Sequence, residues 1–205
     1  MNENQTVFIV DDEKSVRDSI KFLMESIGLQ AKVFSSAQEY LDQFDTNAPG
    51  CLITDIRMPM MSGLDLQQKL SENTLHPPII MITGHGDVPM AVSAIQQGAV
   101  DFVEKPFNNQ KLLDIVYKAL EIDAKCRGEN IKLGDIQQKY QYLTDKERQV
   151  FELIIKGILN KQIAQELFVT QSAIEARRAK IMEKMQANNL SDLMRMGMAM
   201  GMIEV

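Results

Sequence analysis

Short apolar runs rich in β-branched residues alternate with helical patterns throughout the first 120 residues. The first run is Val7-Phe8-Ile9-Val10, and apolar residues recur at i, i+4, i+7 and i+8 in the segment 13–27 that follows it, which is the pattern of an amphipathic helix. The same cycle predicts strands near 30–34, 51–54, 79–82 and 101–104, and helices near 36–44, 63–72, 88–97 and 108–122. Five strands alternating with five helices indicate an α/β fold, a doubly wound five-stranded parallel sheet covered on both faces.

The second half of the chain has a different texture. Residues 121–142 are mostly polar and contain Gly128 and Gly134, which predicts a linker that is partly helical. From Leu143 onward helical patterns dominate, over 144–156, 160–167, 171–185 and 190–200. We therefore expect a first domain over 1–122, a linker over 123–142 and a separate all-α domain over 143–205.

Charge differs between the two halves. The chain has a net charge of −6, but residues 1–120 carry −7 and residues 121–205 carry +1. Any contact with nucleic acid is therefore expected in the second half, with a modest nonspecific affinity that falls with salt. The sequence lacks a secretory signal and a membrane-spanning apolar run. These features predict a cytoplasmic protein without membrane contact, with Cys51 and Cys126 as reduced thiols.

Three carboxylates follow the predicted strands. Asp11 and Asp12 come directly after the first strand and Asp55 comes directly after the third, so all three should lie at the carboxyl edge of the sheet, where open α/β folds bind ligands. Oxygen ligands of this kind suit Mg²⁺. Thr83 and Lys105 end the fourth and fifth strands. A lysine among acids is either a plain ion pair or, with a cation and a hydroxyl, part of a phosphoryl-transfer site.

Together these residues carry a resemblance. Asp11-Asp12, Asp55 with Met58-Pro59 and Gly63, Thr83, and Lys105-Pro106 resemble the response-regulator receiver family over residues 5–122. The resemblance implies a flavodoxin-like fold with Asp55 as phosphoacceptor. It implies a Mg²⁺ site made by Asp11, Asp12, Asp55 and the backbone carbonyl of Arg57. It also implies a Lys105–phosphoryl ion pair, a Thr83 hydrogen bond to the phosphoryl group and a cis peptide bond before Pro106.

The same resemblance implies a mechanism and a partner. A sensor histidine kinase would supply the phosphoryl group, Thr83 would move toward it, and Phe102 would turn inward. The alternative for Phe102 is an ordinary core residue of the fifth strand. The reshaped surface would then promote a homodimer, which raises DNA affinity through effective concentration.

A pair of short helices follows the linker. Thr144 and Glu147 form the pattern of a capping box, the helix 160–167 comes next, and the tight turn 168–170 leads into the helix 171–185. Two short helices joined by a tight turn fit a helix-turn-helix.

The longer pattern in this region is similar to the LuxR/FixJ-type DNA-binding domain. It consists of Leu143-Thr144, Glu147, Gly157, Asn160-Lys161, Ile163-Ala164, Leu167, Val169-Thr170, Ile174-Glu175, Arg178 and Lys184-Met185. The stretch Thr83–Asp87 and the segment after Ala179 are most similar to the FixJ branch. This resemblance implies double-stranded promoter DNA and RNA polymerase as partners.

Helical geometry divides the second helix of the pair into two faces. Ile174, Ile181 and Met185 fall on the core side, and Arg178 lies close to them with a mainly structural role. Glu175 either accepts a hydrogen bond from cytosine or is a solvated residue. The residues predicted to contact DNA are Lys161, Gln171, Ser172, Glu175, Ala176, Arg177, Arg178, Ala179, Lys180 and Lys184.

Three other functions compete with a phosphorylation-controlled DNA-binding regulator. A flavodoxin-like phosphohydrolase would use Asp55 covalently, but it would need a general acid beyond Asp11 and Asp12. An RNA-binding antiterminator is disfavoured by the helix-turn-helix pattern. A regulator controlled by partner binding alone is disfavoured by the intact set of acids and lysine. We therefore expect a regulator and not a dedicated enzyme.

Overall fold

A computed structural model describes residues 5–84 and 88–203 of the chain. Its first part holds a parallel sheet of the strands β1 (Thr6–Val10), β2 (Gln30–Phe34), β3 (Gly50–Asp55), β4 (Ile79–Thr83) and β5 (Asp101–Glu104). The strand order is β2-β1-β3-β4-β5. The sequence predicted this doubly wound α/β fold, and the observed order is the flavodoxin-like one.

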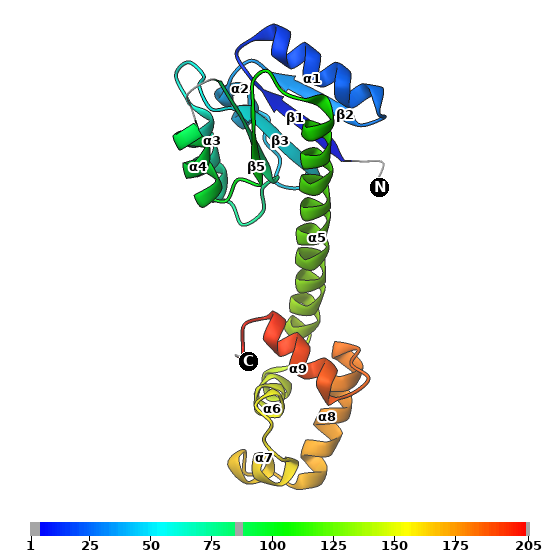
Figure 1. Cartoon of the computed structure of the whole chain (residues 1–205). Coiled ribbons are helices and arrows are strands. Elements are labelled where there is room, and N and C mark those ends of the chain that lie inside the picture. The colour runs from blue at the N-terminus through cyan, green and yellow to red at the C-terminus, as the bar shows by residue number, and fades with distance from the viewer. Residues whose placement is uncertain (1–4, 85–87, 204–205) are drawn as a thin grey trace. The chain divides into compact units, whose positions relative to one another are not determined.

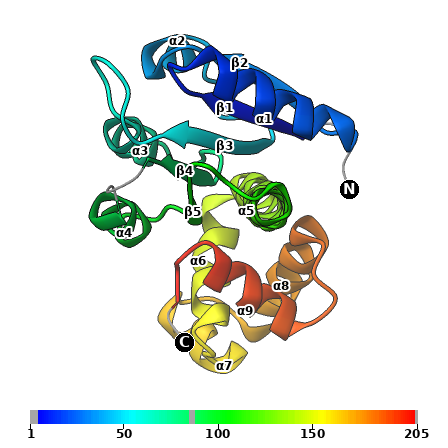
Figure 2. The same ribbon diagram turned by 45° about the horizontal axis from the view of Figure 1, so that its top comes forward.

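Helices cover both faces of the sheet (Figures 1 and 2). One face packs against α1 (Lys14–Ser26) and the first half of α5 (Asn109–Gln141), and its core includes Ile20, Met24 and Val116. The other face packs against α2 (Ala37–Asp42), α3 (Gly63–Ser71) and α4 (Val88–Gln96). The strands β1, β3 and β4 are buried along their whole length, which explains why they are largely apolar runs, whereas the edge strands β2 and β5 are partly exposed.

The helix expected over 108–122 continues much further. It ends at Gln141 and so includes most of the predicted linker, while the packing divides the chain between Arg127 and Gly128. Asp123 and Arg127 explain that position. Asp123 Oδ2 accepts a hydrogen bond from Gly50 N at 2.9 Å, and Arg127 donates to the carbonyl oxygens of Thr46 and Ala48 at 2.7 and 2.8 Å. These bonds hold the helix to the sheet domain as far as Arg127.

The second unit is all-helical, as predicted. It contains the last part of α5 and the helices α6 (Asp145–Ile155), α7 (Asn160–Glu166), α8 (Gln171–Met185) and α9 (Leu190–Ala199). Thr144 and Glu147 form the expected capping box at the start of α6. The core of this unit includes Phe151, Ile163 and Ile174, so α6, α7 and α8 pack around a single centre.

Two further expectations concern the cysteines and the membrane. Cys51 is buried, Cys126 is exposed, and both are free thiols. Over the described ranges, none of the helices has both the length and the apolar character required to cross a membrane.

Candidate functional site: an acidic sheet edge and an exposed helix

The parallel register brings the predicted carboxylates together. Val10 of β1 pairs with Thr54 of β3. The next residues on the two strands, Asp11 and Asp55, therefore lie side by side at the same edge of the sheet. Asp11 is fully buried, Asp55 is 6% exposed, and Asp12 is exposed. Carboxylate oxygens of these three residues lie within 4.8 Å of one another. The edge is therefore an acidic pocket that could hold a metal ion.

Backbone geometry after β3 fixes the Asp55 side chain. Arg57 N donates to Asp55 Oδ1 at 3.0 Å, and Gly63 N donates to Ile56 O at 3.0 Å. A Cβ atom on Gly63 would lie 2.3 Å from the carbonyl oxygen of Asp55. Position 63 therefore requires glycine, because any side chain would push α3 away from the acidic edge.

Lys105 crosses the edge from β5 and binds the acids. Its Nζ atom lies 2.6 Å from Asp55 Oδ2, 2.9 Å from Asp11 Oδ2 and 3.4 Å from Glu13 Oε1. Partial burial by itself would lower the pKa of Lys105, but the hydrogen bonds to Asp55 and Asp11 outweigh it and raise that pKa. Lys105 therefore stays charged at physiological pH.

Burial acts in the opposite sense on Asp11. Loss of water raises the pKa of its carboxyl, although Lys105 and the backbone N–H of Glu13 both act to lower it. Glu13 was not among the predicted site residues. It contributes to the cluster twice, through its backbone N–H and as a third partner of Lys105. Its position directly after Asp12 was the sequence feature that could have indicated this role.

The remaining receiver residues lie around this cluster. Thr83 is buried and its hydroxyl donates to Gly84 O at 3.1 Å. Phe102 is half-buried and packs against the core on the α4 side. The Lys105–Pro106 peptide bond is cis, as predicted. Of the stretch Thr83–Asp87, residues 85–87 lie outside the described ranges.

The buried and exposed side chains of α8 follow the core side and the DNA-facing side that the sequence predicted for this helix. Ile174, Ile181 and Met185 are buried. The predicted DNA contacts that are exposed on this helix are Gln171, Ser172, Glu175, Ala176, Ala179 and Lys180. Arg177 is half-buried. The helix thus presents small and polar side chains to solvent.

Three predicted contact residues border one hollow at the junction of α7 and α8. Lys161, Gln171 and Arg178 line a depression of about 370 Å³. Arg178 Nη1 donates to Asn160 Oδ1 at 3.2 Å, which fits the structural role predicted for Arg178. Asn160 was not singled out as its partner, because a contact between two helices leaves no trace in the periodicity of either.

Lys184 has a partner that the sequence did not predict. Its Nζ lies 2.6 Å from Oε2 of Glu147, whose side chain is 8% exposed. Burial alone would raise the pKa of Glu147, but hydrogen bonds from Lys184 and Thr144 lower it overall. Lys184 therefore ties the end of α8 to the start of α6.

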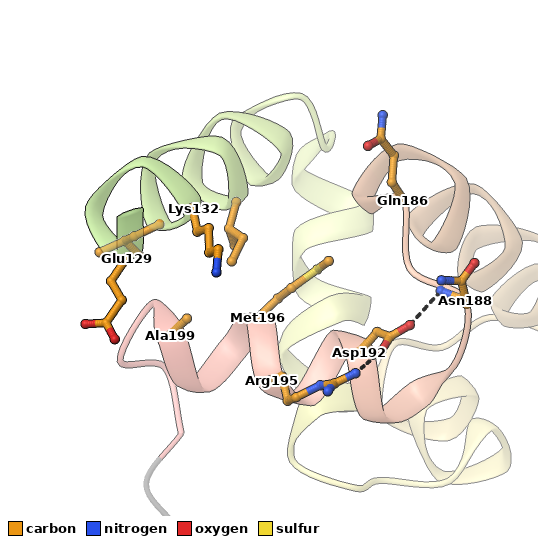
Figure 3. Close-up of a pocket in the computed structure, with 10 residues that line it drawn as sticks. Glu129, Lys132, Gln186, Asn188, Asp192, Arg195, Met196 and Ala199 are labelled. Carbon is orange, nitrogen blue, oxygen red and sulfur yellow. Dashed lines mark hydrogen bonds and ion pairs between the residues drawn. The ribbon is translucent and has the colours of Figure 1, made fainter. Parts of the chain in front are cut away.

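A separate groove lies between the last part of α5 and α9 (Figure 3). Leu133 and Ile136 of α5 and Met196 of α9 contribute apolar surface to a volume of about 530 Å³. Asp192 is paired with Arg195 at its margin. None of the predicted DNA contacts lines this groove. The groove and the exposed surface of α8 are therefore two separate surfaces.

These features define a class of protein. A doubly wound sheet with an acid–lysine cluster at its carboxyl edge is followed by a helical unit with an exposed second helix of a helix-turn-helix. Residues 7–117 match the family model described as the response regulator receiver domain, and residues 141–197 match that of the bacterial regulatory proteins of the luxR family. The chain belongs to the response regulators with a LuxR-type DNA-binding domain.

Relatives that match along nearly the whole chain support this assignment. The response regulator protein TmoT of Ectopseudomonas mendocina is 42% identical over 95% of this chain and 89% of its own. The transcriptional regulatory protein FixJ of Rhizobium meliloti is 41% identical over 96% of both chains. The solved structure of the response regulator StyR is 38% identical with a TM-score of 0.83, covering 94% of this chain and 98% of its own.

The Glu147–Lys184 pair predicts a pH-dependent stability. Folding lowers the pKa of Glu147. Its ionised carboxylate therefore adds to the free energy of unfolding above the unfolded pKa of about 4.3, and this contribution is lost as the pH falls through the folded pKa. Glu147→Gln should destabilise the helical unit by about 1 kcal/mol at pH 7, because glutamine can keep the capping hydrogen bond but loses the ion pair with Lys184. The difference from wild type should shrink below pH 4. Hydrogen exchange of peptides from 143–186 measures this difference in stability between the variant and wild type.

Glu183→Gln is the matched control, because Glu183 is an exposed acid next to Lys184 on α8. It should leave exchange in this region within about 0.5 kcal/mol of wild type at both pH values. An equal loss in the two variants would contradict a specific role for Glu147.

Proposed function

We propose that Asp55 accepts a phosphoryl group from the phosphohistidine of a sensor kinase. The observation that carries the proposal is the contact of Lys105 Nζ with Asp55 Oδ2 at 2.6 Å, in a cluster that also holds Asp11. An Asp55 oxygen attacks phosphorus, a P–O bond forms, and the P–N bond breaks. The electron pair stays on the histidine nitrogen. Lys105 is placed to neutralise the new negative charge.

A Mg²⁺ ion fits the acidic pocket. Three carboxylates within 4.8 Å of one another form an all-oxygen donor set, which this cation prefers. Asp11, Asp12 and Asp55 would hold it, together with the backbone carbonyl of Arg57. When bound, the ion supplies positive charge that offsets repulsion between the carboxylates and the phosphoryl oxygens. Lys105 would then exchange its present carboxylate partners for a phosphoryl oxygen.

Thr83 and Phe102 would convert the new charge into a change of surface. The Thr83 hydroxyl is bonded to the neighbouring Gly84 carbonyl and could turn to a phosphoryl oxygen without leaving a buried donor unpaired. Phe102 lies half-buried on β5 and has no hydroxyl to desolvate on moving inward. A shift from 1:99 to 99:1 between two states requires about 5.5 kcal/mol of differential interaction. Several charge-assisted bonds to the phosphoryl group supply energies of this order.

The altered surface would promote a homodimer that binds promoter DNA and acts on RNA polymerase. The exposed side chains of α8 would enter the major groove, with Glu175, Ala176, Ala179 and Lys180 nearest the bases. Lys161, Arg177 and Arg178 would approach phosphates. Gln171 and Ser172 lie at the first turn of α8, where helix N–H groups also favour a phosphate. Lys184 would reach a phosphate only by leaving Glu147.

The first prediction of this proposal concerns Asp55. In the full chain treated with acetyl phosphate and Mg²⁺, wild type should form dimers and retard duplex DNA selected by the phosphorylated protein. Asp55→Ala should remain monomeric and bind at least tenfold more weakly, because the acceptor oxygen is missing. Light scattering and gel mobility measure the two effects.

Asp42→Ala is the control, since Asp42 is an exposed carboxylate at the end of α2. It should behave as wild type in both assays. Phosphodonor-induced dimers of Asp55→Ala would contradict the proposal. Steady turnover of small phosphate esters by the wild type would favour a phosphohydrolase instead.

The second prediction concerns the face of α8. Lys180 is exposed there and would bring a positive charge into the groove, so Lys180→Ala should weaken binding to the selected duplex and reduce the salt slope by up to about 1, because one cation that offsets phosphate charge is lost. Lys146→Ala, an exposed lysine of α6, should leave the slope unchanged. Equal slopes for both variants and wild type would remove Lys180 from the DNA interface. Fluorescence anisotropy at several salt concentrations gives these slopes.

A further inference from the structure

The helix α4 is held to the receiver by little apolar packing. Of the α4 side chains that the structure describes, Ala94 is the one that is buried, and Met90 is half-buried. Val92 and Ile95 are 47% and 38% exposed. A methyl group buries little apolar area, so the hydrophobic contribution of the Ala94 contact is small. A polar bond to α4 therefore contributes more to fixing its position than it would in a helix with a wide buried apolar stripe.

Such a bond comes from α3, which lies beside α4 in both views of the chain (Figures 1 and 2). Gln67 of α3 is 3% exposed, and its Nε2 donates to the carbonyl oxygen of Ala94 at 3.1 Å. Leu66 and Leu70 on α3 and Ala94 on α4 belong to one buried apolar cluster. The amide of Gln67 therefore lies in surroundings of low dielectric, where a hydrogen bond is stronger than it is in water.

The bond is made at the C-terminal end of α4. The carbonyl oxygen of Ala94 also accepts a hydrogen bond from Ala99 N at 3.0 Å. Gly98 N donates to Ile95 O at 3.0 Å, and Gly98 has a φ of +99°. Together these bonds form the Schellman arrangement that ends many helices. Gln67 therefore contacts the carbonyl at which the last turn of α4 closes, and it holds the end of that helix to α3.

Only half of the Gln67 amide is paired. Its Oε1 atom is buried and has no hydrogen-bond partner within the described part of the chain. An unpaired buried oxygen costs free energy, and a hydrocarbon side chain of similar size would fill the same place without that cost. Stability alone therefore does not explain a glutamine at this position. The donor half of the amide, which reaches α4, is the feature that a hydrocarbon cannot supply.

The start of α3 is fixed to the strand end that carries Asp55. A Cβ atom on Gly63, the first residue of α3, would lie 2.3 Å from the carbonyl oxygen of Asp55, and Gly63 N donates to Ile56 O at 3.0 Å. Gln67 comes four residues later, about 6 Å further along the helix. The first turn of α3 therefore contacts the Asp55 backbone at one end and leads to the amide that holds α4 at the other.

We propose that Gln67 is a positioning residue that holds the C-terminal end of α4 in the conformation of the unphosphorylated chain. The inference rests on the proposed function, in which phosphorylation of Asp55 turns Phe102 inward. Phe102 packs against the same apolar cluster as Ala94, so its turn would disturb the packing beneath α4. A hydrogen bond made in one of two conformations favours that conformation by its differential free energy. The Gln67 bond thus opposes the change of surface in the absence of the phosphoryl group.

The test compares Gln67→Met with Gln68→Met in the full chain. Methionine keeps the length of glutamine and removes both polar atoms, and Gln68 is the exposed neighbour on the same helix. Without phosphodonor, peptides that cover 92–100 should exchange hydrogen about fivefold faster in Gln67→Met, which corresponds to one hydrogen bond. They should exchange at the wild-type rate in Gln68→Met. The melting temperature of Gln67→Met should stay at or above that of wild type, because the unpaired Oε1 is removed as well.

A second readout tests the link to phosphorylation. At a concentration where the wild type is mainly monomeric without phosphodonor, Gln67→Met should contain about fivefold more dimer by light scattering, and Gln68→Met should not. Wild type treated with acetyl phosphate and Mg²⁺ is the reference. If that sample does not dimerise, the proposed function fails, whereas hydrogen exchange still decides whether Gln67 holds α4. Gln67→Leu, which also lacks the amide, takes the place of Gln67→Met if the methionine variant does not fold.

Three results would overturn the proposal. The first is unchanged exchange of 92–100 in Gln67→Met, since the bond would then not hold α4. The second is faster exchange in all receiver peptides together with a lower melting temperature, since Gln67 would then serve the stability of the whole domain. The third is faster exchange confined to 92–100 with no gain of dimer, in a chain whose wild type dimerises on treatment with acetyl phosphate. The bond would then have no part in the response to phosphorylation.

Discussion

The rest of the structure depends on the ion cluster that Lys105 makes at the carboxyl edge of the sheet. Two carboxylates, Asp11 and Asp55, are almost completely removed from water there, and such a pair is unstable without a compensating cation. Lys105 supplies that charge from the opposite side of the fold, two strands away from β3. The cluster closes only when β1, β3 and β5 are in register. The same charges that stabilise the sheet edge thus form the site for chemistry.

Two kinds of connection lead away from this edge. Thr83 and Phe102 stand on β4 and β5, and in the proposed mechanism a change in the charge of Asp55 would alter which groups they contact. The helix α5 is held to the receiver by a separate set of hydrogen bonds. Asp123 accepts one from Gly50, and Arg127 donates to the carbonyl oxygens of Thr46 and Ala48. In the helical unit, the pair of Glu147 and Lys184 gives α8 a comparable attachment to α6. In the described residues, an ion pair thus attaches one functional helix in each domain, Asp123 with Arg127 on α5 and Glu147 with Lys184 at the end of α8.

The sequence predicted the elements and the acidic edge well because both follow from local patterns. Apolar runs such as Val7–Val10 mark buried strands, and residues directly after parallel strands must share an edge. It did not predict Lys184 as the partner of Glu147, since 37 residues separate them and either side chain alone is compatible with solvent. The continuation of α5 past Gly128 was only partly foreseen, because glycine lowers helix propensity while packing of Ile136 and Tyr140 in the helical unit compensates.

The central claim is that Asp55 is the side chain that acquires the phosphoryl group. Peptide mapping by mass spectrometry, after treatment of the full chain with acetyl phosphate, tests this directly. With Mg²⁺ present, the account predicts a single acid-stable, base-labile phosphoryl group on the peptide that contains Asp55, and little labelling when a chelator removes the ion. Labelling of Asp11 or Asp12 instead, or labelling of Asp55 that is indifferent to the chelator, would contradict it.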